Sequence, residues 1–192
     1  MDQPTNRIPE ITPWEVLEEQ DVSPSKYYPV FKQIVRMHGG RVVDGYFISR
    51  LPDAAMVVAI TAAKELIMVR QWRQGIKETT LELPAGQNDG RTPINAARGE
   101  LHEETGATTT TLHPLGIIAI IPPKNSLRMH GFFCHVDEIV EEQDLDQNEN
   151  IEAVKVPLTE IDSLLITGEI SCADTIAFIA LARLKFPEAF LL

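Results

Sequence analysis

The sequence has no long apolar run and few cysteines, and it does not open with the pattern of a secretory signal, and each of these observations argues against a class of protein. No stretch approaches the ~18 consecutive apolar residues that a membrane-spanning helix requires. The start of the chain, Met1–Pro4, has no basic segment followed by an apolar one, so a secretory signal is not expected. The two cysteines, Cys134 and Cys172, do not have the spacing of a metal site or a redox pair. We therefore expect a cytoplasmic protein with free thiols and no membrane partner.

An excess of basic residues is also missing. The chain has 17 Lys and Arg against 28 Asp and Glu, and its formal net charge is −11. Proteins that bind long DNA or RNA place basic patches against the phosphates, so a nucleic-acid partner is not expected. An acidic protein can still bind a small phosphate ester when divalent cations lie between its carboxylates and the phosphate. The charge therefore favours a small-molecule site that uses cations.

The order of the expected elements predicts an α+β fold. With 192 residues, of which 44% are hydrophobic, the chain is long enough to bury a real core. Residues 1–52 are expected to form an irregular arm and strands, and residues 53–192 a second domain. Alternating and β-branched runs predict strands near 14–17 and at 31–37, 41–50, 54–60, 65–72, 111–121, 128–137 and 151–156. Helices are expected at 93–105, 157–165 and 172–184. This order is typical of an α/β/α sandwich with a mixed β-sheet.

The helix expected at 93–105 has recognisable ends and an acidic face. Thr92 is placed to cap its start, and Gly106 is placed to end it. Glu100, Glu103 and Glu104 are three and four residues apart, so they share one face. Like charges at this spacing repel one another, and the C-terminal end of a helix disfavours anions. A hard divalent cation such as Mg²⁺ would compensate, although a solvated acidic face would give the same pattern.

The residues around this helix resemble the Nudix box. The segment Glu100–Ala107 fits the second half of the box, Glu-apolar-x-Glu-Glu-x-Gly-apolar, at every required position. The resemblance extends over roughly residues 30–185 and is greatest to the ADP-ribose pyrophosphatase branch of the Nudix hydrolases. The segments that carry it are Val69–Gly75, Glu82–Gly86, Asn148–Glu152 and Ile170–Thr175, together with a marker proline at Pro122. The resemblance implies a Nudix-type sandwich, with residues 53–192 as the catalytic domain.

The first half of the box departs from the family pattern. Its glutamate position holds Arg91, its arginine position holds Gly99, and the loop from Gly86 to Arg91 is one residue short. In the family these two positions form a structural pair, whereas the later glutamates bind metal. A glycine inside a helix costs about 1 kcal/mol relative to alanine. Gly99 could make room for Arg98 or for a phosphate, and the sequence does not distinguish these uses.

The resemblance implies a role for each matching residue. The Ala85 carbonyl and the carboxylates of Glu100, Glu103, Glu104 and Glu149 match metal-ligand positions. Glu103, Glu104 and Glu149 also match catalytic positions.

The general base and the substrate contacts are less defined. The base stays open between Glu149, Glu103 and Glu152, because the position where some relatives carry it holds Gln147. The residues expected to contact substrate are Arg70, Arg73, Glu82 and Pro122. For the two arginines and Glu82, an ion pair at the sheet edge explains the pattern equally well.

The implied function is Mg²⁺-dependent hydrolysis of the diphosphate bond of ADP-ribose or a related nucleoside diphosphate sugar, with Mn²⁺ as a possible substitute. The products would be a nucleoside monophosphate and a sugar phosphate. GDP-mannose and UDP-glucose are alternative substrates, because the same box serves them. A different class is a degenerate Nudix module that binds ADP-ribose or a related nucleotide as a sensor, without efficient turnover. A scaffold would leave the carboxylates without a role. The resemblance also implies a homodimer formed through residues 1–52.

Overall fold

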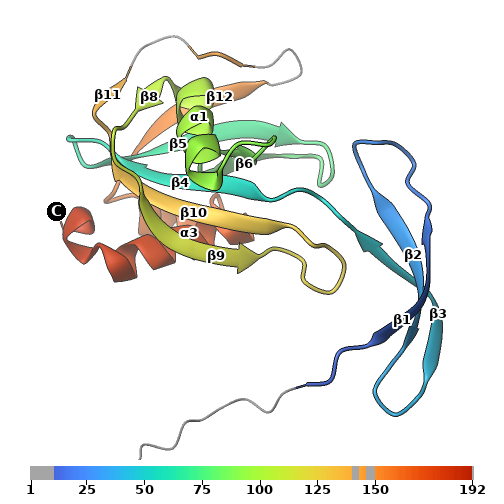
Figure 1. Ribbon diagram of the computed structural model, residues 1–192. Helices are drawn as coiled ribbons and strands as arrows, with labels where there is room; N and C mark the ends of the chain where they lie inside the picture. The colour runs from blue at the N-terminus through green and yellow to red at the C-terminus, as the bar shows by residue number, and fades with distance from the viewer. Residues whose placement is uncertain (1–10, 140–142, 146–149, 192) are drawn as a thin grey trace, which may run out of the picture. The chain divides into compact units, whose positions relative to one another are not determined.

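The computed structural model describes residues 11–139, 143–145 and 150–191 (Figure 1). The chain divides into two compact units. One comprises residues 1–51 and 123–125, and the other comprises residues 52–122 and 126–192. None of the described helices is long and apolar enough to cross a membrane.

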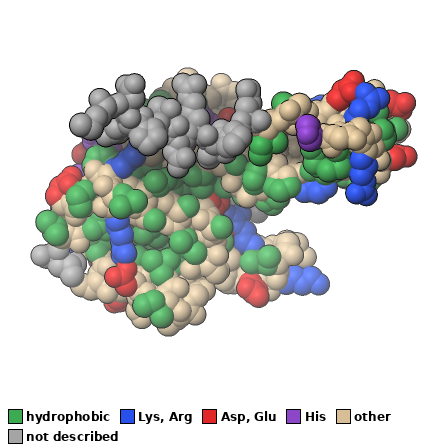
Figure 2. Space-filling model, turned by 90° about the horizontal axis from the view of Figure 1, so that it is seen from below, with side chains coloured by type: hydrophobic (Ala, Val, Ile, Leu, Met, Phe, Trp, Pro, Cys, Tyr) green, Lys and Arg blue, Asp and Glu red, His purple; other side chains and the backbone are tan. Residues whose placement is uncertain are grey.

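The N-terminal unit is a three-stranded antiparallel sheet in the order β1-β2-β3, formed by β1 (Glu15–Asp21), β2 (Val30–Arg36) and β3 (Val42–Ser49). The expected hairpin between the last two strands is confirmed. Gly39 and Gly40 form its turn with φ values of 88° and 86°, which glycine adopts without strain. Figure 2 shows charged side chains of both signs on this unit, interspersed with hydrophobic ones.

The second unit contains a seven-stranded mixed sheet, as expected. Its main path runs β12-β5-β4-β10-β9, with β6 beside β5 and β7 beside β4. β10 runs parallel to β4, whereas the other pairings are antiparallel. The elements are β4 (Ala54–Ile60), β5 (Glu65–Arg73), β6 (Glu78–Glu82), β7 (Ala85–Gln87), α1 (Pro93–Thr105), β8 (Ala107–Thr108), β9 (His113–Ala119), β10 (Arg128–His135), β11 (Glu138–Ile139), β12 (Ile151–Pro157), α2 (Ile161–Thr167), α3 (Ala173–Lys185) and the 3₁₀ helix η1 (Pro187–Phe190).

Alternate residues of β4 supply two separate hydrophobic cores, because successive side chains of a strand point to opposite faces. Met56, Val58 and Ile60 pack with Phe178 and other residues in the α3-side core. The intervening residues of β4 join the α1-side core, which is rich in alanine: Ala55, Ala59, Ala96, Ala97 and Ala107. Figure 1 shows α1 on one face of the sheet and α3 on the other. These layers confirm the expected α/β/α sandwich.

Beside α1, strands β4 and β5 move apart and take different partners, and the chain that connects those partners carries the loop of the site. β4 and β5 pair near their connecting turn, at Ala59 with Ile67. Further along, β5 pairs with β6, while β4 pairs with β7. The chain therefore crosses from one strand to the other at Pro84, whose carbonyl accepts a hydrogen bond from the Val57 N–H at 3.0 Å.

Two local expectations need correction. β6 and β7 were not expected as strands, because their residues lack a clear alternating pattern and depend on pairing with β5 and β4. The helix expected at 157–165 begins only at Ile161. Pro157 instead ends β12, where it pairs with Glu65 of β5.

Candidate active site

Three glutamates of α1 form the centre of the candidate site. The helix has the expected bounds. Pro93 occupies its first turn, and Gly106 ends it in the left-handed conformation with a φ of 68°. Glu100 and Glu104 are 8% and 3% exposed, whereas the side chain of Glu103 is 40% exposed. Two carboxylates are therefore buried against the sheet, and a third lies at the solvent edge.

The loop after Pro84 contacts both buried carboxylates. The Ala85 N–H donates a hydrogen bond to Oε2 of Glu104 at 3.0 Å. A Cβ atom at Gly86 would lie 2.2 Å from Cδ of Glu100 and 2.4 Å from both of its carboxylate oxygens. Gly86 is therefore needed because the Glu100 carboxylate rests directly on its backbone. The structure thus brings together Ala85, Glu100 and Glu104, three of the expected metal-ligand positions.

Arg91 occupies the space above Gly99. Its Nη2 lies 2.7 Å from Oε1 of Glu100, and its Nη1 lies 3.2 Å from Oε1 of Glu103. A Cβ atom at Gly99 would lie 2.4 Å from that Nη1. The glycine thus makes room for Arg91, whereas Arg98 and a phosphate were the uses considered from the sequence. Arg91 and Gly99, the two positions that depart from the box pattern, therefore lie in direct contact and depend on each other.

A polar cavity of about 650 Å³ opens beside these residues. Its lining consists of Gly86, Gln87, Asp89, Arg91, Glu100, Glu103, Asp144 and Leu145. Asp144 was missed as a site residue, although it belongs to the acidic stretch 138–150. Its N–H donates to the Glu103 carbonyl at 2.9 Å, and the Gln143 side chain donates to the Glu104 carbonyl. Gln143 and Asp144 therefore lie at the end of α1 that carries the glutamates.

The remaining expected residues are placed differently. Glu149 and Gln147 lie outside the described residues. Arg70 of β5 pairs with Glu152 of β12 at 3.2 Å, and both side chains are exposed. Pro122 is exposed in the connection between β9 and β10, and it does not line the polar cavity.

Arg73 and Glu82 form a two-point ion pair between β5 and β6. Nε and Nη2 of Arg73 lie 2.7 and 2.6 Å from the two carboxylate oxygens of Glu82. Burial raises the pKa of Glu82, but the hydrogen bonds from Arg73 and Thr80 outweigh it, so its pKa lies below the usual value. Hydrogen bonding to Glu82 raises the pKa of Arg73, and the charge of Glu104 adds to this rise. Both shifts favour the ionised pair, and the negative charge of Glu104 adds to the stabilisation of the Arg73 cation.

The start of α3 adds two groups that the sequence did not indicate as part of the site. Burial, with the nearby Glu82 carboxylate, raises the pKa of Cys172 to about 12. Burial also raises the pKa of Asp174. The Thr175 hydroxyl accepts a hydrogen bond from the Leu83 N–H at 3.2 Å, which fixes the chain just before the crossing at Pro84. A raised pKa favours the protonated thiol, which is a weaker nucleophile than the thiolate.

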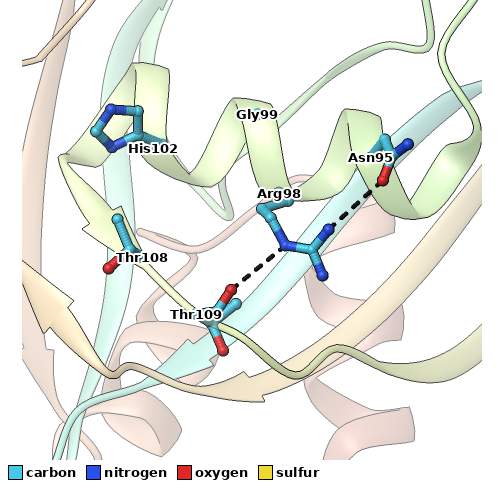
Figure 3. Close-up of a pocket in the computed structure, with 6 residues that line it drawn as sticks. All are labelled: Asn95, Arg98, Gly99, His102, Thr108 and Thr109. Atoms are coloured by element: carbon cyan, nitrogen blue, oxygen red, sulfur yellow. Dashed lines mark hydrogen bonds between the residues drawn. The ribbon is translucent and has the colours of Figure 1, made fainter.

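A second hollow, of about 450 Å³, lies beside α1 and is lined by Asn95, Arg98, Gly99, His102, Thr108 and Thr109 (Figure 3). Arg98 extends along it, with its Nε 3.3 Å from the Thr109 carbonyl and its Nη1 3.5 Å from Oδ1 of Asn95. These are neutral partners, and the surrounding surface is mainly apolar. The polar cavity is thus the better place for phosphate chemistry.

The donor chemistry of the carboxylate cluster fits a hard divalent cation. Such ions prefer carboxylate and carbonyl oxygens, and Glu100, Glu103, Glu104 and the Ala85 carbonyl supply them. The guanidinium seated between Glu100 and Glu103 shows that the cluster is acidic enough to hold a cation. In the described parts of the chain, no three or more His, Cys, Asp or Glu side chains form a ready-made ligand group.

Comparison with known proteins agrees with this geometry. The family described as NUDIX domain matches residues 50–175. The chain is 27% identical over 173 residues to an ADP-ribose pyrophosphatase of Bacillus subtilis (strain 168). The aligned residues cover 89% of this chain and 93% of that protein. It is 29% identical over 144 residues to a methanol dehydrogenase activator of Bacillus methanolicus, covering 74% and 77% of the two chains. A solved structure of an ADP compounds hydrolase has the same fold, with a TM-score of 0.79, 23% identity and coverage of 93% and 97%. The fold, the placement of the glutamates and the match over residues 50–175 together show that this chain belongs to the Nudix hydrolase family.

Proposed function

We propose that the protein hydrolyses the diphosphate bond of ADP-ribose, or of a related nucleoside diphosphate sugar, with Mg²⁺ as cofactor and Mn²⁺ as a substitute. The observation that carries this proposal is the set of three α1 glutamates: Glu100 and Glu104 contact Gly86 and Ala85, and Glu100 and Glu103 line the polar cavity of about 650 Å³. The products would be a nucleoside monophosphate and a sugar phosphate. The names of the Bacillus subtilis pyrophosphatase and the ADP compounds hydrolase support this choice of substrate.

The solvent exposure of the α1 glutamates suggests a different role for each in the proposed reaction. A bound divalent cation would offset the charge of the diphosphate and lower the pKa of a bound water. The buried carboxylates of Glu100 and Glu104, with the Ala85 carbonyl, are suited to hold that cation, because the protein fixes their positions. Glu103 is the suitable general base among the described glutamates of α1, because its half-exposed carboxylate can reach water in the cavity. Glu149 keeps its proposed role as a further ligand or base.

The residues on β5 and β6 are proposed to bind the substrate. Arg73 is held by Glu82, yet its side chain remains 44% exposed, so part of its guanidinium can contact a ligand. Arg70 is more exposed and is tied to Glu152 by an exposed ion pair, which is worth at most about 1 kcal/mol. A phosphate or ribose could therefore displace that pairing at little cost. Pro122 keeps its proposed contact from the family pattern alone.

A substrate panel tests the proposal. Purified protein would be incubated with ADP-ribose, GDP-mannose or UDP-glucose, with Mg²⁺ or with EDTA, and products would be separated by ion-exchange chromatography. We expect AMP and ribose 5-phosphate from ADP-ribose, with Mg²⁺ only. Preferred turnover of another sugar would change the substrate, and no turnover of any would contradict hydrolysis.

A nucleotide sensor remains the second candidate. The observation that favours it is Arg91, whose charge already pairs with Glu100 and Glu103. Calorimetry would distinguish the two functions. A sensor would bind ADP-ribose with Mg²⁺ present and leave it intact, whereas the proposed enzyme would consume it.

We also propose that residues 1–52 form a homodimer interface and that residues 53–192 are the catalytic domain. Large hydrophobic side chains of the N-terminal unit are exposed in the single chain, including Val16, Val42 and Phe47. Exposed apolar groups of this number favour association. Light scattering coupled to size exclusion should give twice the 21.4 kDa chain mass, and Phe47→Ser should shift it toward the monomer. A monomeric wild-type protein would contradict the interface.

A further inference from the structure

Arg91 is fixed among the site carboxylates by several acceptors. Besides its contacts with Glu100 and Glu103, its Nε lies 3.4 Å from the Asn88 carbonyl and its Nη2 lies 3.4 Å from the Gln87 carbonyl. The side chain is 32% exposed, so water only partly screens its charge. The guanidinium is thus an ordered cation in the cavity, on carboxylates that match metal-ligand positions.

The backbone of α1 is shaped to accept this cation. A Cβ atom at Gly99 would lie 2.4 Å from Nη1 of Arg91 and 3.1 Å from Oε1 of Glu103. Any larger residue at this position would push the guanidinium away from the carboxylates. Gly99 therefore retains Arg91 in the site, at the helix-propensity cost that a mid-helix glycine carries.

We infer that Arg91 is a resident cation of the site, which competes with divalent metal for the carboxylates of Glu100 and Glu103. This inference rests on the proposed function, because it assumes that these carboxylates bind metal. A metal ion that coordinates Glu100 must displace the guanidinium or share its carboxylate against electrostatic repulsion. Arginine remains charged at every physiological pH, so this competition is permanent. The protein thus binds divalent cations more weakly than its glutamates alone would allow.

Metal affinity of the nucleotide-free protein tests the inference directly. Mn²⁺ binding would be measured by electron paramagnetic resonance of the free ion, and Mg²⁺ binding by calorimetry. One neighbouring charge changes the ionic equilibrium of a carboxylate by about 10- to 1000-fold. We therefore expect Arg91→Ala to tighten Mn²⁺ binding at least about tenfold. The matched control is Arg98→Ala, which removes the same charge from a side chain bonded to Thr109 and Asn95, and it should change affinity by less than about threefold.

Gly99→Ala provides an independent route to the same state. Its methyl group would displace the flexible end of Arg91, so we expect tighter Mn²⁺ binding in this variant also. In the Arg91→Ala background the methyl no longer meets the guanidinium and keeps only the 3.1 Å approach to Oε1 of Glu103, so the tightening attributed to Arg91 should not be added a second time. Thermal melts would verify that each variant is folded.

The outcomes separate this inference from the proposed function. Unchanged, weaker or undetectable Mn²⁺ binding in Arg91→Ala would overturn the resident cation, even if the wild-type protein hydrolyses ADP-ribose with Mg²⁺. Tighter binding without any hydrolysis would support the resident cation and contradict the proposed enzyme. Equal tightening in Arg98→Ala would show a general charge effect and would also overturn the inference.

Discussion

The substitution Gly86→Ala should separate catalysis from folding. The added methyl carbon would lie 2.2 Å from Cδ of Glu100, where ordinary contacts begin at about 3.4 Å. The carboxylate would therefore have to move by about 1.2 Å, or the loop would have to move away from α1. The backbone at Gly86 does not have a positive φ, so alanine adds no conformational strain of its own.

The expected effect on rate follows from that displacement. Moving a catalytic group by about 1 Å costs roughly 100-fold in rate. This loss equals about 2.7 kcal/mol of transition-state stabilisation. We therefore expect kcat/KM for ADP-ribose to fall about 100-fold, with a melting temperature within a few degrees of the wild-type value.

The matched control is Gly75→Ala. Gly75 also lacks a positive φ, and a Cβ atom there would meet nothing within 4 Å. This variant should keep wild-type activity. The reasoning would be refuted if folded Gly86→Ala retained kcat/KM within threefold of wild type, or if the control lost activity equally.

Three further predictions concern catalysis, acid stability and packing. Glu104→Gln should lower kcat about 1000-fold, while its amide oxygen still accepts the Ala85 N–H bond and keeps the melting temperature; wild-type turnover would exclude Glu104 as a metal ligand. Glu82→Gln should destabilise the protein at pH 7, because it removes the charged partner of Arg73. Folding lowers the pKa of Glu82, so the ionised carboxylate adds to the free energy of unfolding of the wild-type protein. This contribution is fully present above the unfolded pKa of about 4.3 and is lost as the pH falls through the folded pKa. Urea unfolding at pH 7 and pH 3 should show this difference narrowing, and a constant difference would contradict it. Gly131→Ala would place a methyl 2.0 Å from the buried ring of Phe178, which should cost about 2 kcal/mol; calorimetry should show a melting temperature lower by about 4–8 °C, and an unchanged value would contradict this packing.

The fold was largely predictable because its strongest signals are local. α1 has a proline in its first turn and a glycine at its end, and both bounds were predicted correctly. β4 is buried along its whole length, and its apolar run gave its bounds without error. β6 and β7 were missed because they are short and depend on partners supplied by β5 and β4. Pairing between distant residues leaves no periodic trace in such short segments.

The candidate site was predictable only in part. The three glutamates follow from helical spacing, because residues three and four apart must share a face. The position of Arg91 does not follow, because its reach over Gly99 depends on how the loop from Gly86 meets the helix. Cys172 interacts with Glu82 across 90 residues of sequence, because the start of α3 meets the chain just after β6, where the Leu83 N–H bonds the Thr175 hydroxyl. Contacts of this kind need the tertiary structure.

The alanines packed between the sheet and α1 determine how close the helix lies to the sheet, and therefore how close its glutamates lie to the Ala85–Gly86 loop. Ala96 and Ala97 let the helix approach β4 closely, since neither side chain extends beyond one methyl group. The Ala85 N–H of β7, the strand that pairs with β4, donates its hydrogen bond to Glu104 of the same helix. A larger residue at either alanine would push α1 away from the sheet and separate its carboxylates from the loop that they contact. Core residues that do not line the polar cavity can therefore change the activity. They do so through their side-chain volume, which fixes the distance between the helix that carries the carboxylates and the loop that they contact.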